Sequence, residues 1–199
     1  KKIHPSIVTT VQEIWKIFVG LTLGSIALFL LAGMPLWGAI NHGMTGIATG
    51  GFSVHAASIG FYDSPVIEYA TVPIMVAGSI AFPIHYLIFK GEVRNLYTDL
   101  QTRWVFIWFG VGSLVLTGIL HANGQYATLE ETFRIALFQF VSGTSNTGFG
   151  SAAVGGGTEQ VWSAGATLWV CLGMLTGAAA GSTVSGLKLI RVITLVKGT

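Results

Sequence analysis

Residues 47–53 read Ile-Ala-Thr-Gly-Gly-Phe-Ser, and residues 144–150 read Thr-Ser-Asn-Thr-Gly-Phe-Gly. Both segments place a glycine directly before a phenylalanine, with an offset of 97 residues between the two copies. A second match joins QEIW at residues 12–15 to QTRW at residues 101–104, with an offset of 89. Internal repeats of this kind are common in transport proteins. The two matches therefore predict a duplicated unit, with a longer loop before the second glycine segment.

Long apolar runs flank both glycine segments. Hydrophobic residues make up 52% of the 199 residues and charged residues only 9%, against about 25% in an average soluble domain. About 18 or more apolar residues are enough to cross a hydrocarbon core roughly 30 Å thick. Spans are expected at residues 14–33, 66–89, 104–120 and 161–196. The prolines Pro73 and Pro83 are expected to kink the second of them, because each removes a backbone donor.

A short helix leads into each glycine segment. Residues 36–46 and 128–143 favour helix but are too short to span the bilayer. The order span, short helix, glycine segment, span thus occurs twice. The sequence predicts an all-α integral membrane protein made of two helix–pore-loop–helix units, at residues 1–97 and 98–199.

The glycine segments have the chemistry of a cation pathway. Irregular backbone at membrane depth is tolerated only where it is buried in protein or lines a water-filled path. A short helix that ends there directs its carbonyl groups at one point, and rings of carbonyl oxygens can replace the water shell of a cation. Glycine permits the backbone angles that this arrangement needs. The candidate ligand residues are Ala48, Thr49, Gly50, Gly51, Asn146, Thr147, Gly148 and Phe149.

The phenylalanines Phe52 and Phe149 are expected to wedge these segments against neighbouring helices. The alternative interpretation is a pair of ordinary tight turns at the membrane surface. The repetition of each segment after a short helix and between two spans favours the pathway.

The last apolar run is too long for one span. As one helix, about 36 residues would extend roughly 54 Å, well beyond the hydrocarbon core. Its glycine-rich segment, residues 177–186, is the expected break, since glycine weakens a helix and hydroxyl side chains can bond the freed backbone groups. The candidate gate residues are Gly177, Gly181, Ser182, Thr183 and Gly186. A glycine-rich helix kinked for packing is the alternative.

Lysine and arginine are distributed unevenly. Nine of the ten lie at the chain start, in residues 90–103 or at the chain end, and only Arg134 lies elsewhere. By the positive-inside rule those three regions are cytoplasmic, so both glycine segments enter from the outer face. Arg134 is expected to pair with Glu130 or Glu131 on its own helix.

Catalytic and metal-binding patterns are missing from the sequence. Cys171 is the single cysteine, and the five histidines share no metal-ligand spacing. The sequence holds no Ser/His/Asp constellation, paired-carboxylate motif or phosphate-binding loop, and no basic cluster that indicates nucleic acid. We therefore expect neither an enzyme nor a nucleic-acid-binding protein, and no cofactor besides a transported ion.

Three stretches carry a resemblance to a known family. Residues 41–53 together with Asp63-Ser64-Pro65 resemble the second repeat of the membrane subunits of Trk-type potassium uptake proteins, in the Trk/Ktr/HKT superfamily. Residues 138–149 resemble the filter of the third repeat, and residues 180–191 resemble the gate region and its basic exit. The chain departs from the family at residues 181–188, where GSTVSGLK stands for the usual GSTGGGIK. Two fewer glycines are expected to stiffen that loop.

The resemblance implies a pseudo-fourfold K⁺ pore in which Gly51 and Gly148 are the filter glycines of two quadrants. The first and fourth repeats are not in this chain, which is expected to be a fragment of a longer protein. The implied partners are those two repeats, membrane lipid, a second copy in a homodimer and a cytosolic nucleotide-binding regulatory subunit. Candidate contacts for that subunit are Lys90, Arg94, Lys188 and Arg191.

The function expected is K⁺ uptake across a prokaryotic plasma (inner) membrane through a gated filter. Two alternatives stay open at this point. One is a non-conducting membrane scaffold or assembly subunit, and the other is a secondary transporter that binds an organic solute at the broken last helix.

Overall fold

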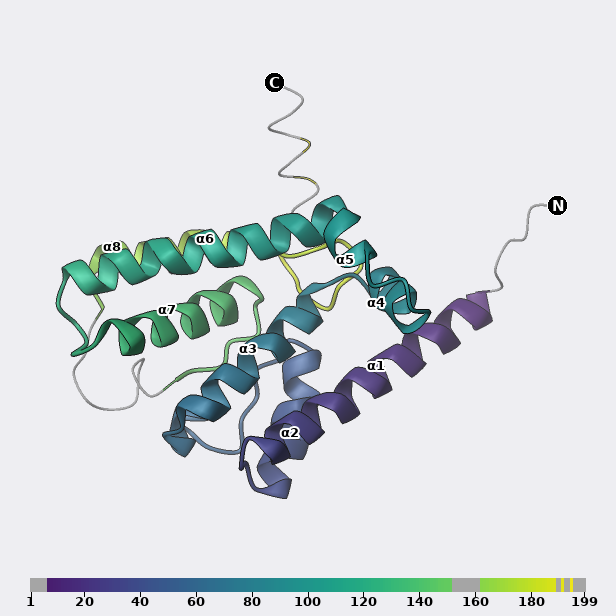
Figure 1. Ribbon diagram of the computed structural model, residues 1–199, viewed down its shortest axis with the longest axis horizontal. Coiled ribbons are helices and arrows are strands. Elements are labelled where there is room, and N and C mark those ends of the chain that lie inside the picture. The colour runs from purple at the N-terminus through teal and green to yellow at the C-terminus, as the bar shows by residue number, and fades with distance from the viewer. Residues whose placement is uncertain (1–6, 152–161, 189–190, 192–193, 195–199) are drawn as a thin grey trace.

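The computed structural model describes residues 7–151, 162–188, 191 and 194 (Figure 1). The elements are α1 (Ile7–Leu31), α2 (Leu36–Ile47), the 3₁₀ turn η1 (Ser58–Tyr62), α3 (Pro65–Ser79), α4 (Phe82–Phe89), α5 (Asn95–Thr98), α6 (Leu100–Ala122), α7 (Leu129–Thr144) and α8 (Ala164–Leu175). The described residues form no strand, only one isolated bridge between Thr176 and Leu187. The expected all-α class is confirmed.

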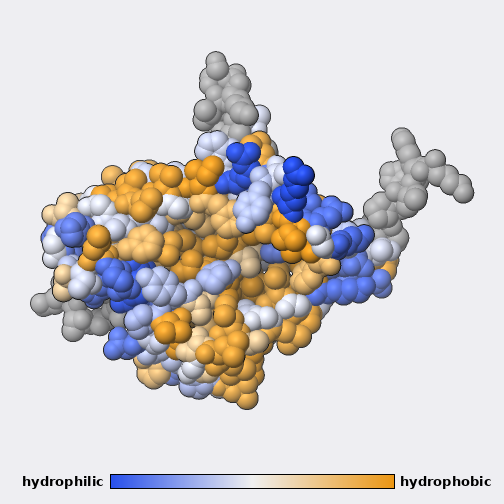
Figure 2. All heavy atoms as spheres, viewed as in Figure 1, coloured by the Kyte–Doolittle hydropathy of each residue, from blue (hydrophilic) through white to orange (hydrophobic). Residues whose placement is uncertain are grey.

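Among the described residues, α1 and α6 are long and apolar enough to cross a membrane, and α3 with α4 would be a third span if the bent pair crosses as one. Helices α1 and α6 expose large apolar side chains such as Trp15, Leu31 and Leu114, as lipid-facing helices do. Figure 2 shows hydrophobic residues over the middle of the visible face, with hydrophilic residues near α4 and α5 and near the start of α7. This distribution fits a molecule whose two hydrophilic regions face water on opposite sides of a bilayer.

The span expected at residues 66–89 is two helices rather than one kinked helix. α3 continues through Pro73, and the chain then bends by 106° between α3 and α4. The break at Ile80 and Ala81 directly precedes Phe82-Pro83, because proline disfavours helix at the residue before it but fits the first turn of a new helix. The expected kink is therefore a complete break, since α3 ends at Ser79 and Pro83 lies in the first turn of α4.

The last apolar run is also broken. After α8 the chain leaves the helix, and the Gly177 amide donates to the Leu187 carbonyl over 2.7 Å while the Leu187 amide donates to the Leu175 carbonyl over 3.3 Å. These bonds close residues 177–186 into a loop, so the expected break is present. Of the segment beyond Lys188, only residues 191 and 194 are described.

The two short helices are central and the long helices surround them. α2 packs on α1 and α3, while α7 packs on α3, α6 and α8. Thr128 begins α7 as its N-cap, with Oγ1 accepting the Glu131 amide over 3.2 Å. One buried cluster, which includes Phe29, extends from α1–α3 to α6, α7 and the loop after α8. A smaller one, which includes Phe140, lies among α6, α7 and α8. α2 and α7 therefore deliver the glycine segments to the interior.

Candidate ion pathway

The two glycine segments share a backbone pattern at equivalent positions. Thr49 and Gly51 have φ values of 50° and 62°, and Asn146 and Gly148 have φ values of 52° and 79°. The residue between the members of each pair does not have a positive φ. Alternating signs of φ turn successive carbonyl oxygens toward one side of the chain, which is the arrangement that a row of cation ligands needs.

Thr49 is an unusual residue for this conformation. A β-branched side chain is rarely found at positive φ, and such backbone strain is typical of ligand-binding segments that the surrounding structure holds in place. Asn146, at the equivalent position, tolerates the conformation more readily. Both segments thus keep the same backbone despite different side chains.

A hydroxyl on each short helix holds the phenylalanine that follows the glycine. Thr45 Oγ1 lies 2.9 Å from the carbonyl oxygen of Phe52, and Ser142 Oγ lies 2.6 Å from that of Phe149. The carbonyl oxygens of Thr45 and Ser142 also accept amides from the glycine segments, over 2.8 Å and 3.1 Å. Thr45 and Ser142 are again 97 residues apart, so the same hydrogen bonds shape both segments.

The two glycine segments meet at Gly51. A Cβ added there would overlap the carbonyl oxygen of Thr147 and lie 2.8 Å from the carbonyl carbon of that residue. Gly148 differs, because no described atom lies within 4 Å of a Cβ added to it. The first segment is thus packed against the second at this point, while Gly148 borders open space.

The phenylalanines after the two glycines have different environments. Phe149 is 1% exposed, its ring centroid lies 5.6 Å from that of His42, and it approaches Gly46. The expected wedge is therefore present at Phe149. At Phe52 it is wrong, because this side chain is 77% exposed. Phe149 packs against His42 and Gly46 of α2, whereas no described helix covers Phe52.

The loop at residues 177–186 docks on the break between α3 and α4. The Ala179 amide donates to the Ser79 carbonyl over 3.3 Å, and the Phe82 amide donates to the Gly181 carbonyl over 3.1 Å. In Figure 1 this yellow segment returns from α8 to the end of α3. The break between α3 and α4 thus receives the loop that follows α8.

The same loop contacts both glycine segments. Thr183 Oγ1 lies 3.0 Å from the carbonyl oxygen of Ile47 and 2.9 Å from that of Gly78. The Asn146 side-chain amide donates to the Ser185 carbonyl over 3.3 Å. Residues 177–186 carry no charged side chain, and Lys188 just beyond them donates to the Val184 carbonyl. The arrangement places an uncharged, hydrogen-bonded loop directly against the candidate ligands.

Gly181 and Gly186 give this loop its shape. Their φ values of 84° and 86° lie where side chains are disfavoured. Gly177 is required for a different reason, since a Cβ there would overlap the carbonyl oxygen of Ser185. The candidate gate residues therefore act in holding one compact loop.

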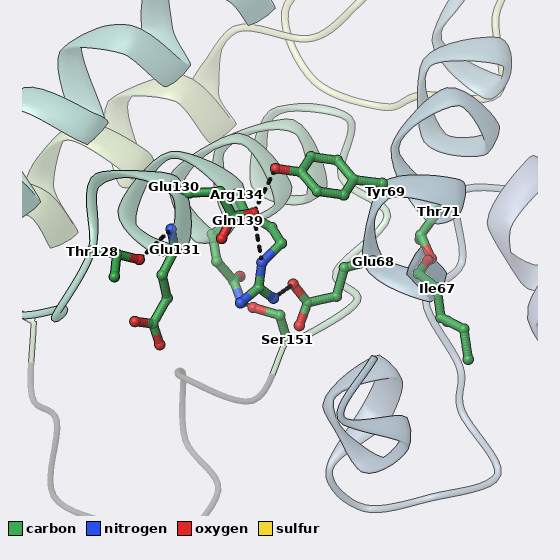
Figure 3. Close-up of polar contacts among 10 residues, drawn as sticks. All are labelled: Ile67, Glu68, Tyr69, Thr71, Thr128, Glu130, Glu131, Arg134, Gln139 and Ser151. Carbon is green, nitrogen blue, oxygen red and sulfur yellow. Dashed lines mark hydrogen bonds and ion pairs between the residues drawn. The ribbon is translucent and has the colours of Figure 1, made fainter. Parts of the chain in front are cut away.

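Arg134 lies in a cluster that joins α7 to α3 (Figure 3). Its guanidinium pairs with Glu68 of α3, and its Nε lies 3.5 Å from Glu130 Oε1. Tyr69 of α3 donates its hydroxyl proton to the same Glu130 oxygen over 3.0 Å. The expected pair with Glu130 is confirmed. The pair with Glu68, whose side chain is only 4% exposed, was missed because no local spacing connects residues 66 positions apart.

Metal chelation by side chains is not a feature of the described residues, which contain no group of three or more His, Cys, Asp or Glu side chains placed to hold an ion. The candidate cation ligands among the described residues are the backbone carbonyl and hydroxyl oxygens of the glycine segments. Such neutral oxygen ligands suit a weakly held monovalent cation that must leave again.

The sequence and the fold are similar to those of known cation transport proteins. The family model described as "TrkH: Cation transport protein" matches residues 1–199. The Trk system potassium uptake protein TrkH of Halomonas elongata is 29% identical over 98% of this chain, and that of Vibrio parahaemolyticus is 33% identical over 98%. The crystal structure of the potassium transporter TrkH from Vibrio parahaemolyticus superposes with a TM-score of 0.90 and 30% identity, covering 98% of this chain and 41% of that one.

These comparisons confirm the resemblance that the glycine segments suggested. The chain spans about 40% of the length of the two curated relatives. Its apolar helices and its relatives identify a multi-pass protein of the prokaryotic plasma membrane. The chain belongs to the TrkH family of cation transport proteins.

Proposed function

We propose that this chain forms two pore units of a K⁺ uptake protein and that its glycine segments are two quadrants of the selectivity filter. The observation that carries the proposal is the shared backbone pattern, with positive φ at Thr49 and Gly51 and again at Asn146 and Gly148. The proposed ligands are the oxygens of residues 48–51 and 146–149. The relatives named as potassium uptake proteins support K⁺ as the substrate.

The proposed units are residues 1–97 and 98–199. Each contains a long helix, a short buried helix and a glycine segment, and the equivalent hydroxyls of Thr45 and Ser142 support the division. A fourfold pore needs two further units of this kind. Phe149 of the second unit packs on the short helix of the first. By analogy, the exposed side chain of Phe52 would pack on the short helix of a preceding unit.

A homodimer and a cytosolic nucleotide-binding regulatory subunit are the further partners that we propose. Lys90 and Arg94 are exposed between α4 and α6, and Arg191 is exposed near the chain end. Lys188 is partly buried against the loop through Val184, which leaves the other three cations freer to bind acidic groups. Anionic lipid would use the same charges.

K⁺ flux tests the function directly. The full-length protein that contains these units is expected to take up Rb⁺ or K⁺ into proteoliposomes down an electrochemical gradient, with Na⁺ taken up more slowly. Flux is measured in the parent protein and in protein-free vesicles. No alkali-cation flux would favour a scaffold, and uptake of an organic solute without cation dependence would favour a secondary transporter.

The loop at residues 177–186 is the proposed gate. Gln101, at the start of α6 next to the cytoplasmic connector, accepts the Ala180 amide with Oε1 over 2.9 Å. Among the described residues, no hydrogen bond joins the Gln101 side chain to either glycine segment. Movement of the connector would therefore pull on the loop through this side chain without touching the proposed ligands.

Gln101→Leu is expected to raise basal Rb⁺ flux roughly threefold to tenfold, because one hydrogen bond that holds the loop is lost. K⁺ over Na⁺ discrimination should stay unchanged. Gln12→Leu is the matched control, since Gln12 occupies the equivalent position near the start of the first long helix and is exposed. Unchanged flux in Gln101→Leu would remove the latch role from this residue.

A further inference from the structure

Two buried polar residues occupy equivalent positions on the short helices. His42 on α2 is 0% exposed and Gln139 on α7 is 9% exposed, and they are 97 residues apart, as the glycine segments are. His42 Nε2 lies 2.9 Å from Ser53 Oγ. Gln139 Nε2 donates to Ser151 Oγ over 3.1 Å (Figure 3). Each polar residue thus bonds a serine just beyond the glycine-phenylalanine pair of its own unit.

The hydrogen bonds of the first unit have a fixed direction. His42 Nδ1 lies 2.8 Å from the Gly38 carbonyl oxygen, which can only accept, so Nδ1 carries the proton. In the neutral ring, Nε2 therefore accepts from the Ser53 hydroxyl. Ser53 Oγ in turn accepts the His55 amide over 3.1 Å. The chain of donors runs from the loop to the short helix with every partner satisfied.

The second unit reaches the same result with another side chain. Gln139 donates from its amide, and the serine that accepts, Ser151, is 2% exposed. The neighbouring Gly150 is held by the first unit, since its amide donates to Ser58 Oγ over 3.1 Å and its carbonyl accepts the Gly60 amide over 3.0 Å. The outer end of the second glycine segment is therefore fixed from both units.

Each glycine segment is held on both sides of its glycine. Before the glycine, the amides of Gly50 and Thr147 donate to the carbonyls of Thr45 and Ser142. After it, the hydroxyls of Thr45 and Ser142 hold the carbonyls of the following phenylalanines, and His42 and Gln139 hold the serines beyond. A segment fixed on both sides cannot widen without breaking a hydrogen bond. His42 also contacts the ring of Phe149, so it contacts both segments.

We propose that His42 and Gln139 are positioning residues that fix the width of the ion pathway by tethering Ser53 and Ser151. The inference rests on the proposed function, because it assigns these tethers to the selectivity filter. Discrimination between ions by carbonyl oxygens depends on how many oxygens reach the ion and how far they can move. A loosened segment admits both K⁺ and Na⁺, so loss of a tether lowers discrimination more than it lowers K⁺ flux.

The test uses the full-length protein in proteoliposomes and measures Rb⁺ uptake together with its competition by K⁺ and by Na⁺. Ser53→Ala and Ser151→Ala each remove one tether with little change in volume. Both are expected to lower K⁺ over Na⁺ discrimination roughly threefold to tenfold. Ser113→Ala is the matched control, because Ser113 is 1% exposed and its hydroxyl has no hydrogen-bond partner among the described residues.

Substitutions at His42 separate tethering from packing. His42→Gln introduces the side chain that the second unit uses at this position and is expected to keep discrimination near the parent value. His42→Leu fills similar space without a hydrogen bond and is expected to match Ser53→Ala. If His42→Leu does not fold, Ser53→Ala and His42→Gln still decide the comparison.

Parent-like discrimination in Ser53→Ala and Ser151→Ala would overturn the tether inference and leave the filter proposal intact. Loss of discrimination in His42→Gln equal to that in Ser53→Ala would also overturn it, since the tethering side chain would then not matter. A parent protein that conducts no alkali cation would instead overturn the proposed function itself. The parent measurement therefore distinguishes the two failures.

Discussion

Gly51→Ser is expected to reduce Rb⁺ uptake by the full-length protein at least about 100-fold. The φ value of 62° at Gly51 already disfavours any side chain, at a cost on the order of 1 to 3 kcal/mol. The added Cβ would also overlap the Thr147 carbonyl of the second glycine segment. Relief of that overlap must move one segment relative to the other, so the proposed ligands of the two segments no longer keep their relative positions.

Gly148→Ser should have a smaller and different effect. Its φ of 79° brings a similar strain, but no described atom lies within 4 Å of the added Cβ. The variant is expected to keep measurable Rb⁺ flux while K⁺ over Na⁺ discrimination falls. Gly118→Ser is the control for both, because Gly118 has open space and no positive φ. Parent-like flux and discrimination in well-expressed Gly51→Ser would refute its place in the filter.

Much of this arrangement could be predicted because it depends on local sequence. The long apolar runs, the short helices and the break at residues 177–186 each follow from composition and glycine spacing within one segment. The offset of 97 residues extended to features that were not predicted, such as the equivalent hydrogen bonds of Thr45 and Ser142. The alignment of the two glycine segments therefore predicts that other residues 97 positions apart also have equivalent contacts.

The rest depends on contacts between distant segments. The bend of 106° at residues 80 and 81 is shaped by the docking of Ala179 and Gly181 as well as by Pro83. Phe52 and Phe149 follow equivalent glycines, yet one is exposed and the other buried, because only Phe149 faces a helix of the other described unit. The sequence of one segment does not indicate which distant segment will pack against it, so these contacts could not be predicted.

Glu68→Gln is expected to lower the free energy of unfolding by about 3 kcal/mol. Glu68 is 3% exposed and its side chain pairs with Arg134, and removing one member of a buried ion pair leaves the other charge uncompensated. Glu130 reduces the loss only in part, since its side chain is 63% exposed and lies 3.5 Å from Arg134. The measurement is SDS titration of the purified full-length protein in mixed micelles.

Glu13→Gln provides the control, because its pair with Lys16 is on the surface, with side chains 37% and 70% exposed. Loss of such a pair is expected to cost less than about 1 kcal/mol. A comparable loss of stability in both variants would show that burial of the Glu68 pair has no special role.

The exchange Glu68→Arg with Arg134→Glu separates attraction between the two helices from the loss of either side chain. Each single reversal places two like charges in a buried site, so both should be less stable than Glu68→Gln. The double variant restores opposite charges across α3 and α7 and should regain part of the loss, although Tyr69 and Glu130 then face an altered partner. Because α7 carries the second glycine segment, K⁺ over Na⁺ discrimination should recover together with stability. If the double variant loses as much free energy of unfolding as the two single reversals together, the pair does not join α3 to α7.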